Sequence, residues 1–507
     1  MGFSFVYAST LIGLKAMPVR VEADISPGLP RFTIVGLPDA AVSEARERVR
    51  SAIKNSALPF PRTAVTINLA PADVRKQGPM YDLAIALGIL GASNVIENVV
   101  TMQKTLFLGE LALDGGIRPV HGILLTALMA KAQGYEALVV ATDNAAEAAL
   151  VKGIKIHPAK SLLEVVSHFN QLIKLPEQTE TLFVENTTAG EDMLHIRGQE
   201  QVKRALEVAA AGGHNLLMHG PPGGGKTMLA RALPSLLPPL TFEDMLEITA
   251  IHSVAGILRE HDSLVRLRPF RQPHHTASGI ALVGGGAWAK PGEISLAHRG
   301  VLFLDEFPEF SRLVLENLRQ PLEDGVVTVS RAAGTYEYPA RFMLVASMNP
   351  CPCGYLHDTK RACTCTPTQI TKYQQKISGP LLDRIDIVTE VPRVDIEKLA
   401  STVPGENSSA IRIRVLEARM RQRERYQDTP INTNAELRAS LLKEHCNLNS
   451  ECVLLMKMAV DKLHLSARAY TRVLKVGRTI ADLAQSAMIQ TEHIAEALQY
   501  RPKSHHV

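Results

Sequence analysis

Two stretches of the chain carry residue types that could bind and hydrolyse a nucleoside triphosphate. The first fits the pattern G-x-x-x-x-G-K-[ST] and lies between an apolar run, 216–218, and a helix-forming segment, 228–237, which is the context that a phosphate loop requires. Glycines let consecutive backbone N–H groups face the phosphates, the lysine reaches the β- and γ-phosphates, and the next hydroxyl group binds Mg²⁺. The predicted nucleotide-binding residues are Gly220, Pro221, Pro222, Gly223, Gly224, Gly225, Lys226 and Thr227.

The second stretch is an apolar run, 301–304, that ends in two carboxylates. Four consecutive apolar residues are typical of a buried parallel strand. At its end, Asp305 is predicted to hold Mg²⁺ together with Thr227, and Glu306 to orient or activate the attacking water. A glycine turn and an acidic strand end without a nucleotide role are the alternative interpretation. The presence of both halves in chain order favours a site for ATP and Mg²⁺.

Four of the six cysteines form two C-x-C pairs that are separated by nine residues. Paired thiols at such separations can close a tetrahedral Zn²⁺ site, which stabilises a small loop that has little core of its own. In C-x-C the two cysteines are one residue closer in the chain than in the usual C-x-x-C of zinc sites. Uncoordinated thiols and a redox switch therefore stay open as alternatives. The predicted zinc ligands are Cys351, Cys353, Cys363 and Cys365, whereas Cys446 and Cys452 fall in a helical region and are expected to be ordinary buried residues.

The length of 507 residues predicts about three structural units. Residues 1–170 alternate strand-like and helical runs, which indicates an α+β domain, and 171–192 are polar and read as a linker. Residues 193–394 contain both nucleotide stretches and are expected to form a parallel-sheet core, and 395–507 are helical. The fold class predicted for the whole chain is therefore α/β.

Composition places few restrictions on the partners of the protein. The net charge of +4 comes from 55 basic and 51 acidic residues, so bulk charge neither demands nor excludes a polyanionic partner. The N-terminal residues lack the features of a targeting signal, and no apolar run approaches about 18 residues. We therefore expect a cytoplasmic protein without a membrane partner, whose cysteines are thiols or metal ligands.

Three further segments complete the nucleotide-binding core. An insertion at 271–298 contains glycines and paired histidines, an alternating run at 325–339 predicts a β-hairpin, and a strand at 342–347 leads to Asn349. This order resembles the branch of AAA+ ATPases that contains magnesium-chelatase motor subunits, MoxR proteins and MCM helicases. The resemblance gives Asn349 the sensor-1 position, where an amide can hydrogen-bond the γ-phosphate or the attacking water.

Arginines near the end of the core resemble those that complete such motors. Arg384 occupies the place of the arginine finger, which acts on the γ-phosphate of a neighbouring subunit and requires an oligomer. An ordinary ion pair with Asp383 or Asp386 is the alternative. In the helical region, Arg468 resembles the sensor-2 arginine and Arg472 is the second choice, because residues at i and i+4 share one helix face.

A run of six arginines between 412 and 425 has apolar residues along one helical stripe. We interpret it as an exposed helix of the lid, with a nucleic-acid-binding patch as the alternative.

The N-terminal region resembles the proteolytic domain of Lon, especially at 76–80 and 109–124. In Lon-type proteases these segments supply a serine nucleophile and the lysine that activates it. Met80 and Leu124 stand at those places here, and neither a thioether nor an alkyl chain can attack a carbonyl or accept a proton. The resemblance therefore predicts a Lon-like fold without the catalytic dyad.

Taken over its whole length, the chain resembles the YifB/ComM family of magnesium-chelatase-like ATPases, with its most family-specific stretches at 273–278 and 291–298. The resemblance implies an ATP-driven homohexameric ring that translocates on single-stranded or branched DNA, a branch-migration helicase that acts in natural transformation. An ATPase that remodels protein partners is the main alternative, and a Lon-like protease is a weaker one. The candidate DNA contacts are His274, His275, Lys290 and Arg331.

Overall fold

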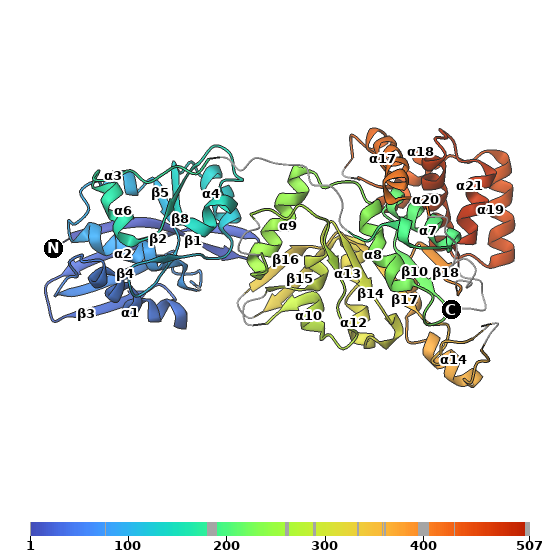
Figure 1. Cartoon of the computed structure of the whole chain (residues 1–507), viewed down its shortest axis with the longest axis horizontal. Helices are drawn as coiled ribbons and strands as arrows, with labels where there is room; N and C mark the ends of the chain where they lie inside the picture. Colours follow the sequence, from blue (N-terminus) through green and yellow to red (C-terminus); the bar gives the residue numbers. More distant parts are fainter. Residues whose placement is uncertain are drawn as a thin grey trace. The chain divides into compact units, whose positions relative to one another are not determined.

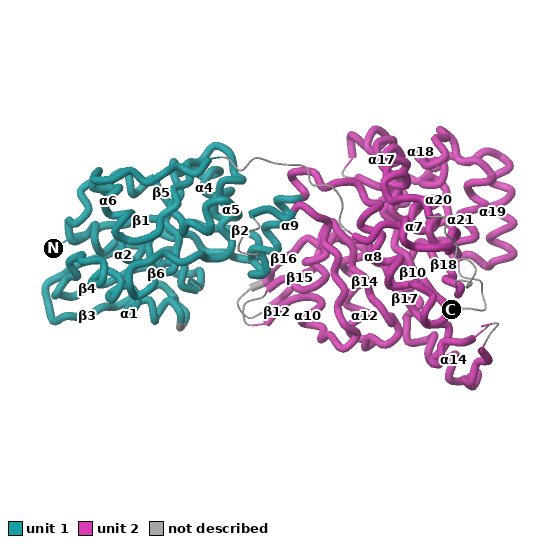
Figure 2. Tube along the Cα trace, viewed as in Figure 1, with its two compact units in different colours: residues 1–185, 245–265 teal, residues 186–244, 266–507 magenta. Residues whose placement is uncertain are grey.

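The computed structural model describes the chain except for residues 1, 77, 180–189, 259–262, 287–289, 332–333, 357, 359–360, 394–404, 430 and 502–507. The chain divides into two compact units (Figure 2). Unit 1 comprises Met1–Glu185 and Met245–Val265, and unit 2 comprises Asn186–Asp244 and Arg266–Val507. Residues 180–189 of the predicted linker, 171–192, lie outside the described residues.

Unit 1 is built on a mixed sheet of seven strands in the order β3-β4-β2-β1-β5-β8-β9. The two long strands β1 and β2 form an antiparallel hairpin, and the strands from β1 to β9 on the other side run parallel. The strands are β1 (Gly2–Ile12), β2 (Lys15–Ser26), β3 (Arg31–Val35), β4 (Ala64–Ala70), β5 (Thr105–Phe107), β8 (Ala137–Ala141) and β9 (Lys155–Ala159).

Helix α2 (Asp82–Ala92) is the centre of the unit 1 core, and every one of its residues is buried. It packs against β1 and β2 (Figure 1), which explains why its sequence is apolar on all faces. The other elements are α1 (Ala40–Asn55), η1 (Pro79–Tyr81), α3 (Val99–Met102), β6 (Glu110–Leu111), β7 (Ile117–Arg118), α4 (Ile123–Ala132), η2 (Thr142–Asn144), α5 (Ala145–Ala148) and α6 (Leu162–Phe169).

Unit 2 contains a parallel sheet of five strands in the order β11-β14-β17-β10-β18. Its central strands are short, apolar and buried, as the sequence of a sheet covered on both faces requires. Because the strands are parallel, their carboxyl ends meet at one edge. The strands are β10 (Leu216–His219), β11 (Phe270–Arg271), β14 (Val301–Leu304), β17 (Met343–Met348) and β18 (Ile387–Glu390).

Helices and two small hairpins surround this sheet. Helix α7 packs against β18 and α8 packs against β17, and the hairpin β12–β13 lies beside β15 of the hairpin β15–β16. The elements are η3 (Met193–His195), α7 (Glu200–Gly212), α8 (Lys226–Leu236), α10 (Gly279–Val283), β12 (Gly284–Gly285), β13 (Lys290–Pro291), α11 (Glu293–Leu296), η4 (Phe307–Glu309), α12 (Arg312–Glu316), α13 (Arg319–Asp324), β15 (Val326–Arg331), β16 (Gly334–Pro339), α14 (Pro367–Gln374) and α15 (Gly379–Leu382). Helix α9 (Phe242–Ala255) begins in unit 2 and continues from Met245 in unit 1.

The C-terminal region is a helical lid that packs on α7 and α8 through its first helix, α17. A buried polar network joins its helices: Asp482 pairs with Arg425 at 2.5 Å and with Arg478 at 3.0 Å. The lid contains α17 (Ser408–Arg425), η5 (Asn434–Glu436), α18 (Ala439–His445), α19 (Ser450–Leu463), α20 (Ala467–Leu483) and α21 (Thr491–Gln499). The parallel sheet and this helical region confirm the predicted α/β class.

The arginine run forms α17, but several of its side chains are engaged within unit 2. Arg414 pairs with Glu207 at 2.5 Å, and Arg419 donates to the carbonyl of Ala210 at 2.7 Å. These contacts hold α17 against α7 and give both arginines a structural role, although the side chain of Arg414 is still 41% exposed. In the described parts of the chain, no helix combines the length and the apolar character that crossing a bilayer would need.

Candidate nucleotide-binding site

The phosphate loop connects the end of β10 at His219 to the start of α8 at Lys226. Gly223 and Gly225 have φ angles of 78° and 85°, a left-handed conformation that residues with a side chain adopt only with strain. A Cβ atom at Gly220 would lie 2.1 Å from the carbonyl oxygen of Val391, so this position excludes any larger residue. The loop thus leads directly into the first turn of α8, whose N–H groups are available to an anion.

Lys226 folds back onto its own loop. Its ammonium group donates to the carbonyls of Gly220 at 2.7 Å and Pro221 at 2.9 Å, and to the side-chain oxygen of Asn349 at 3.1 Å. Burial lowers the pKa of Lys226 to about 8, although the charge of Asp305 opposes this shift. The structure therefore brings the predicted phosphate-binding lysine and the predicted sensor into direct contact.

Two oxygen ligands lie side by side at the carboxyl edge of the sheet. The hydroxyl of Thr227 donates to Asp305 at 3.0 Å, and hard oxygens of this kind suit Mg²⁺, which is usually held by one or two protein groups and by water. Ser347 also hydrogen-bonds the Asp305 carboxylate. Sequence analysis missed this buried serine, although a polar residue in the otherwise apolar strand β17 is a usable signal.

Glu306 follows Asp305 with a φ angle of 53°, the left-handed region that few residues other than glycine adopt. Its carboxylate lies 3.1 Å from Nδ1 of His275, and the ring of His275 packs at 4.2 Å between centroids against His274. The insertion between β11 and α10 thus reaches the predicted water-orienting residue. No pattern in the sequence indicates that His275, a predicted DNA contact, pairs with Glu306.

A cavity of about 520 Å³ opens beside the phosphate loop. Its wall combines apolar side chains with two arginines, which suits a nucleotide base and its ribose. Gln199 fixes one side, because its amide donates to the carbonyls of Pro392 at 2.5 Å and Gly224 at 3.3 Å. Sequence analysis assigned none of the following lining residues: His195, Ile196, Arg197, Gln199, Met228, Leu229 and Arg393.

The arginines predicted to complete the motor have different surroundings. Arg384 hydrogen-bonds the carbonyl of Pro380 and pairs with Glu323, rather than with Asp383 or Asp386 as the alternative interpretation expects. Asp383 instead binds Arg472 at 2.8 Å and Arg468 at 3.5 Å.

Exposure separates the two sensor-2 candidates. The side chain of Arg472 is 6% exposed, and it also donates to the carbonyls of Leu382 and Ile385, which ties α20 to the segment that carries Arg384. The side chain of Arg468 is 64% exposed. Arg472 therefore has a structural role, whereas the guanidinium of Arg468 is accessible to a ligand.

Comparison with known proteins identifies the family. Models for "Magnesium chelatase, subunit ChlI", "Subunit ChlI of Mg-chelatase" and "Magnesium chelatase, subunit ChlI C-terminal" match residues 192–399, 21–144 and 405–501. The chain is 45% identical to "Competence protein ComM" of Haemophilus influenzae over 509 residues, which cover 99% of this chain and 98% of that protein. The chain belongs to the YifB/ComM family of magnesium-chelatase-like proteins.

Two other relatives fit this assignment. "Uncharacterized protein YifB" of Escherichia coli is 44% identical over 504 residues, which cover 99% of this chain and 97% of that protein. The "Magnesium-chelatase 38 kDa subunit" of Cereibacter sphaeroides is 31% identical over 173 residues, which cover 31% of this chain and 51% of that protein. The magnesium-chelatase family is one of AAA+ ATPases, so the site described above belongs to an ATPase.

In this YifB/ComM family member the four clustered cysteines converge. Sulfur atoms of Cys351, Cys353 and Cys363 lie 3.4 to 3.7 Å apart, and all four Sγ atoms, including that of Cys365, lie within 4.8 Å of one another. A tetrahedral zinc with Zn–S bonds of about 2.3 Å needs sulfur separations of about 3.8 Å, so the arrangement fits Zn²⁺. Cys446 and Cys452 are buried in the lid, which confirms the prediction for them.

The candidate DNA contacts lie on segments of unit 2 outside the sheet. His274 and Lys290 are exposed, and Lys290 belongs to the hairpin β12–β13, which lies beside β15. Arg331 is the last residue of β15. The two hairpins that carry Lys290 and Arg331 are therefore neighbours.

Unit 1 has apolar residues at the two positions that the sequence resemblance assigns to the dyad of Lon-type proteases. Met80 is 8% exposed and Leu124 is fully buried. The backbone N–H of Leu124 donates to the carboxylate of Glu147 at 3.1 Å. Both side chains are core residues, and neither offers a nucleophile or a base.

Proposed function

We propose that the protein is an ATP-driven motor that forms a homohexameric ring and translocates on single-stranded or branched DNA. Its proposed task is branch migration during recombination, which aids the integration of transforming DNA. The observation that carries this proposal is the full-length likeness to a protein named "Competence protein ComM". The convergence of Lys226, Asp305 and Asn349 at one sheet edge supports the motor chemistry.

In this proposal the hydrogen bonds within the site are exchanged for contacts with the nucleotide. Lys226 leaves the carbonyls of its loop and binds the β- and γ-phosphates, while Thr227 and Asp305 would hold Mg²⁺. The metal ion neutralises charge that develops on the phosphates. Glu306 orients the attacking water, and the amide of Asn349 hydrogen-bonds the γ-phosphate or that water.

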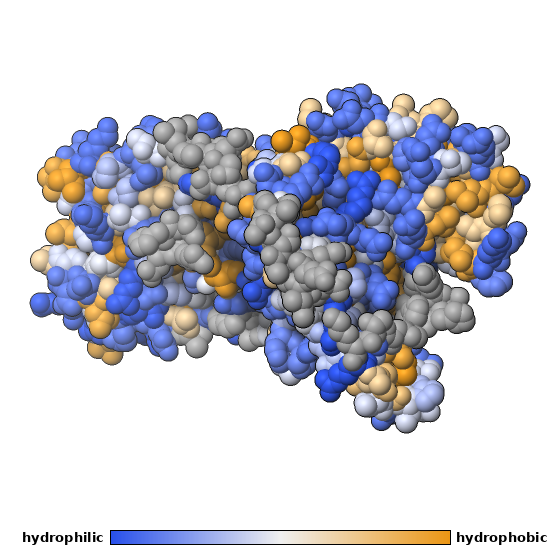
Figure 3. Space-filling view, turned by 45° about the vertical axis from the view of Figure 1, so that its right-hand side comes forward, coloured by the Kyte–Doolittle hydropathy of each residue, from blue (hydrophilic) through white to orange (hydrophobic). Residues whose placement is uncertain are grey.

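Assembly into a ring is part of the same proposal. An arginine finger acts across a subunit boundary, which assigns Arg384 to the nucleotide of a neighbouring subunit and leaves Arg468 to sense nucleotide within its own. Side chains on α19 support a subunit contact, because Leu454 and Met458 are 61% and 46% exposed. Figure 3 shows apolar residues gathered on the surface of the C-terminal helices, and large exposed apolar patches usually mark interfaces.

For DNA we propose contact through the adjacent hairpins β12–β13 and β15–β16, with Lys290, Arg331 and the exposed His274 facing phosphates. We also propose that unit 1 is a Lon-like domain that has lost its catalytic dyad, and that four cysteines hold one structural Zn²⁺. The burial of Met80 and Leu124 and the sulfur separations support these two assignments.

A second candidate function is the remodelling of a protein partner. A partial likeness to a protein named "Magnesium-chelatase 38 kDa subunit" favours this candidate. That match covers 31% of this chain. The family alone does not separate the two functions, because both need the same ATPase.

The deciding experiment is the rate of ATP hydrolysis with and without forked DNA, with Glu306→Gln as the inactive control. We expect forked DNA to raise the rate and the protein to unwind the fork. If DNA neither binds nor changes the rate, the DNA motor is wrong and partner remodelling takes its place. Hydrolysis of a peptide substrate would contradict the assignment of unit 1.

A further inference from the structure

The cysteine loop, residues 351–365, touches the nucleotide site directly. Cys351 comes two residues after Asn349, and the loop then turns back at Gly354, whose φ angle is 83°. A Cβ atom on Gly354 would lie 2.6 Å from Cδ of Pro222 in the phosphate loop and 3.8 Å from the amide carbon of Asn349. The cysteine loop therefore forms an outer wall of the phosphate loop.

The same loop also holds a residue of the nucleotide cavity. Arg393 lines that cavity, and its guanidinium binds the carboxylate of Asp358 at 3.0 Å and lies 5.4 Å from the ring centre of Tyr355. Arg361 packs on the same ring at 4.2 Å and hydrogen-bonds its hydroxyl at 3.0 Å. Tyr355 and Asp358 lie between the two cysteine pairs, so the position of Arg393 depends on how that segment is folded.

Apolar packing contributes little to the described part of this segment. Among its described residues only Cys351 and Gly354 are buried as whole residues, and the side chain of Asp358 is 3% exposed. The exit is anchored, since Thr366 caps α14 immediately after Cys365. A metal ion bound by four thiolates would supply the stability that an apolar core supplies elsewhere.

We infer that metal occupancy of the cysteine loop controls ATP affinity, because the metal positions the segment that supports Pro222 and holds Arg393 in the nucleotide cavity. The inference deepens the proposed function and rests on its nucleotide and zinc sites. In this inference Tyr355 and Asp358 position Arg393, and Arg393 binds the nucleotide. None of the three is a metal ligand. Loss of zinc would loosen both the phosphate side and the base side of the pocket.

The test measures the dissociation constant of a fluorescent ATP analogue for the full-length protein in three states: as purified, after metal removal by a chelator, and after return of Zn²⁺. Zinc content is measured in parallel. We expect metal removal to weaken binding by roughly tenfold or more, the scale of one lost charge-assisted contact, and Zn²⁺ to restore it. Cys452→Ser, which changes a buried cysteine outside the cluster, is the matched control and should leave zinc content and affinity unchanged.

Two variants separate the positioning of Arg393 by the cysteine loop from unfolding of the loop. Tyr355→Ala and Arg393→Ala should keep one zinc per chain and the thermal melting temperature of the wild type, yet weaken nucleotide binding. Cys363→Ser should lose zinc and affinity together. A protein that binds zinc stoichiometrically but keeps its ATP affinity after metal removal would overturn the inference, as would a purified protein without metal that binds ATP tightly. Failure of every preparation to bind nucleotide would instead overturn the proposed function.

Discussion

The buried Lys76 of unit 1 and the half-buried Lys226 of unit 2 both donate to backbone carbonyls, yet only Lys226 is placed to meet a ligand. In unit 1, Lys76 is fully buried, donates to the carbonyl of Pro71, and has a pKa that burial lowers. In unit 2, Lys226 has the same type of partner, but its loop borders a cavity and it also contacts Asn349. A buried charge becomes a binding group where a ligand can take over its hydrogen bonds.

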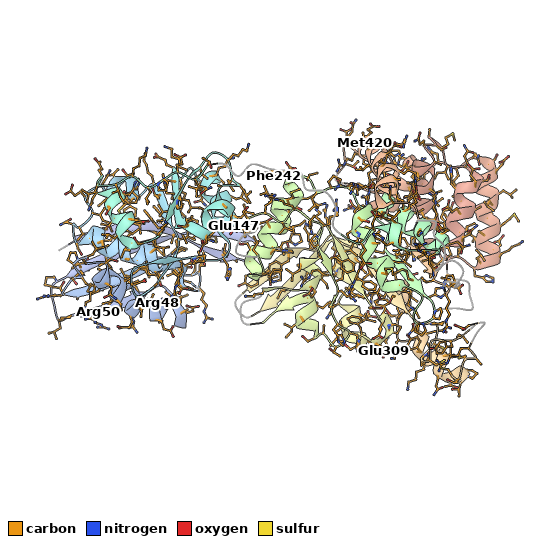
Figure 4. The ribbon with its side chains drawn as sticks, in the orientation of Figure 1. Arg48, Arg50, Glu147, Phe242, Glu309 and Met420 are labelled. Carbon is orange, nitrogen blue, oxygen red and sulfur yellow. The ribbon has the colours of Figure 1, made fainter. Side chains whose placement is uncertain are left out.

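Buried carboxylates repeat this contrast. Asp82 pairs with Arg48 at 2.7 Å and accepts from the N–H of Leu111, while burial raises its pKa to about 6. Glu147 is likewise held by Leu124 and Ser253 (Figure 4 labels Arg48 and Glu147). In unit 2, Asp305 accepts hydrogen bonds from the hydroxyls of Thr227 and Ser347 and from the N–H of Glu306, groups that can share it with a metal ion.

The largest effect on activity should come from replacing Lys226, and replacing Lys76 is the comparison. Lys226→Ala should abolish tight nucleotide binding and hydrolysis, because it removes the charge that meets the phosphates, whereas Glu306→Gln should bind ATP without hydrolysing it. Lys76→Met should lower the melting temperature of the protein but leave nucleotide affinity unchanged. Equilibrium binding of ATP and steady-state hydrolysis are measured for all three variants, and thermal melting is measured for Lys76→Met. Normal turnover in Glu306→Gln would contradict the role of that carboxylate.

Arg384→Ala should reduce kcat by roughly 10³-fold and leave nucleotide affinity largely intact, since a finger acts on charge in the transition state. Mixing this variant with Lys226→Ala should restore part of the hydrolysis, because intact fingers then face intact nucleotide sites. Arg472→Ala is the comparison, and its loss should appear as reduced thermal stability. A mixture that co-assembles but stays inactive would show that Arg384 does not act between subunits.

The affinity for ATP should depend on pH through Lys226. Burial lowers its pKa from 10.5 to about 8 in the free protein, whereas bound phosphates favour the charged form. Affinity should therefore be constant below about pH 8 and fall by up to about tenfold per pH unit above it. The guanidinium in Lys226→Arg stays charged, so the affinity of that variant, although weaker, should be flat between about pH 7 and pH 9. A flat wild-type profile would exclude a neutral lysine in the free state.

The smallest effect is expected at the hairpins of unit 2. Arg331→Ala should weaken DNA binding similarly for different sequences and reduce the slope of log K against log salt by about one, because one phosphate contact is lost. Lys104→Ala in unit 1, an exposed lysine paired with Glu136, is the control for a change in net charge. If Arg331→Ala and Lys290→Ala together leave DNA binding unchanged, the contact surface lies elsewhere.

Sequence patterns predicted the elements that depend on local chemistry. Apolar spacing predicts a helix at 40–56 and a strand at 64–69, and the structure has α1 (Ala40–Asn55) and β4 (Ala64–Ala70) at these places. The sequence at 312–322 predicts one helix, whereas the structure has two shorter helices, α12 and α13.

Contacts between residues far apart in the chain were not predictable. Three ion pairs leave no pattern in the sequence: His275 with Glu306, Arg384 with Glu323, and Asp358 with Arg393. A motif fixes the type of residue at each position, whereas the partner of each side chain is set by tertiary packing. The cavity residue Arg393 was missed for that reason.

The position of helix α9 in the chain affects how unit 1 can be produced as a separate domain. Its first turn belongs to unit 2, but from Met245 onward it is part of unit 1, where Ser253 donates to Glu147 at 2.7 Å and accepts from the N–H of Gly122 at 2.8 Å. A fragment that ends near residue 185 would expose the surface that α9 covers and leave a buried carboxylate short of a partner. Unit 1 is therefore expected to need α9 supplied in trans, or fused by a linker, to be purified as an independent domain.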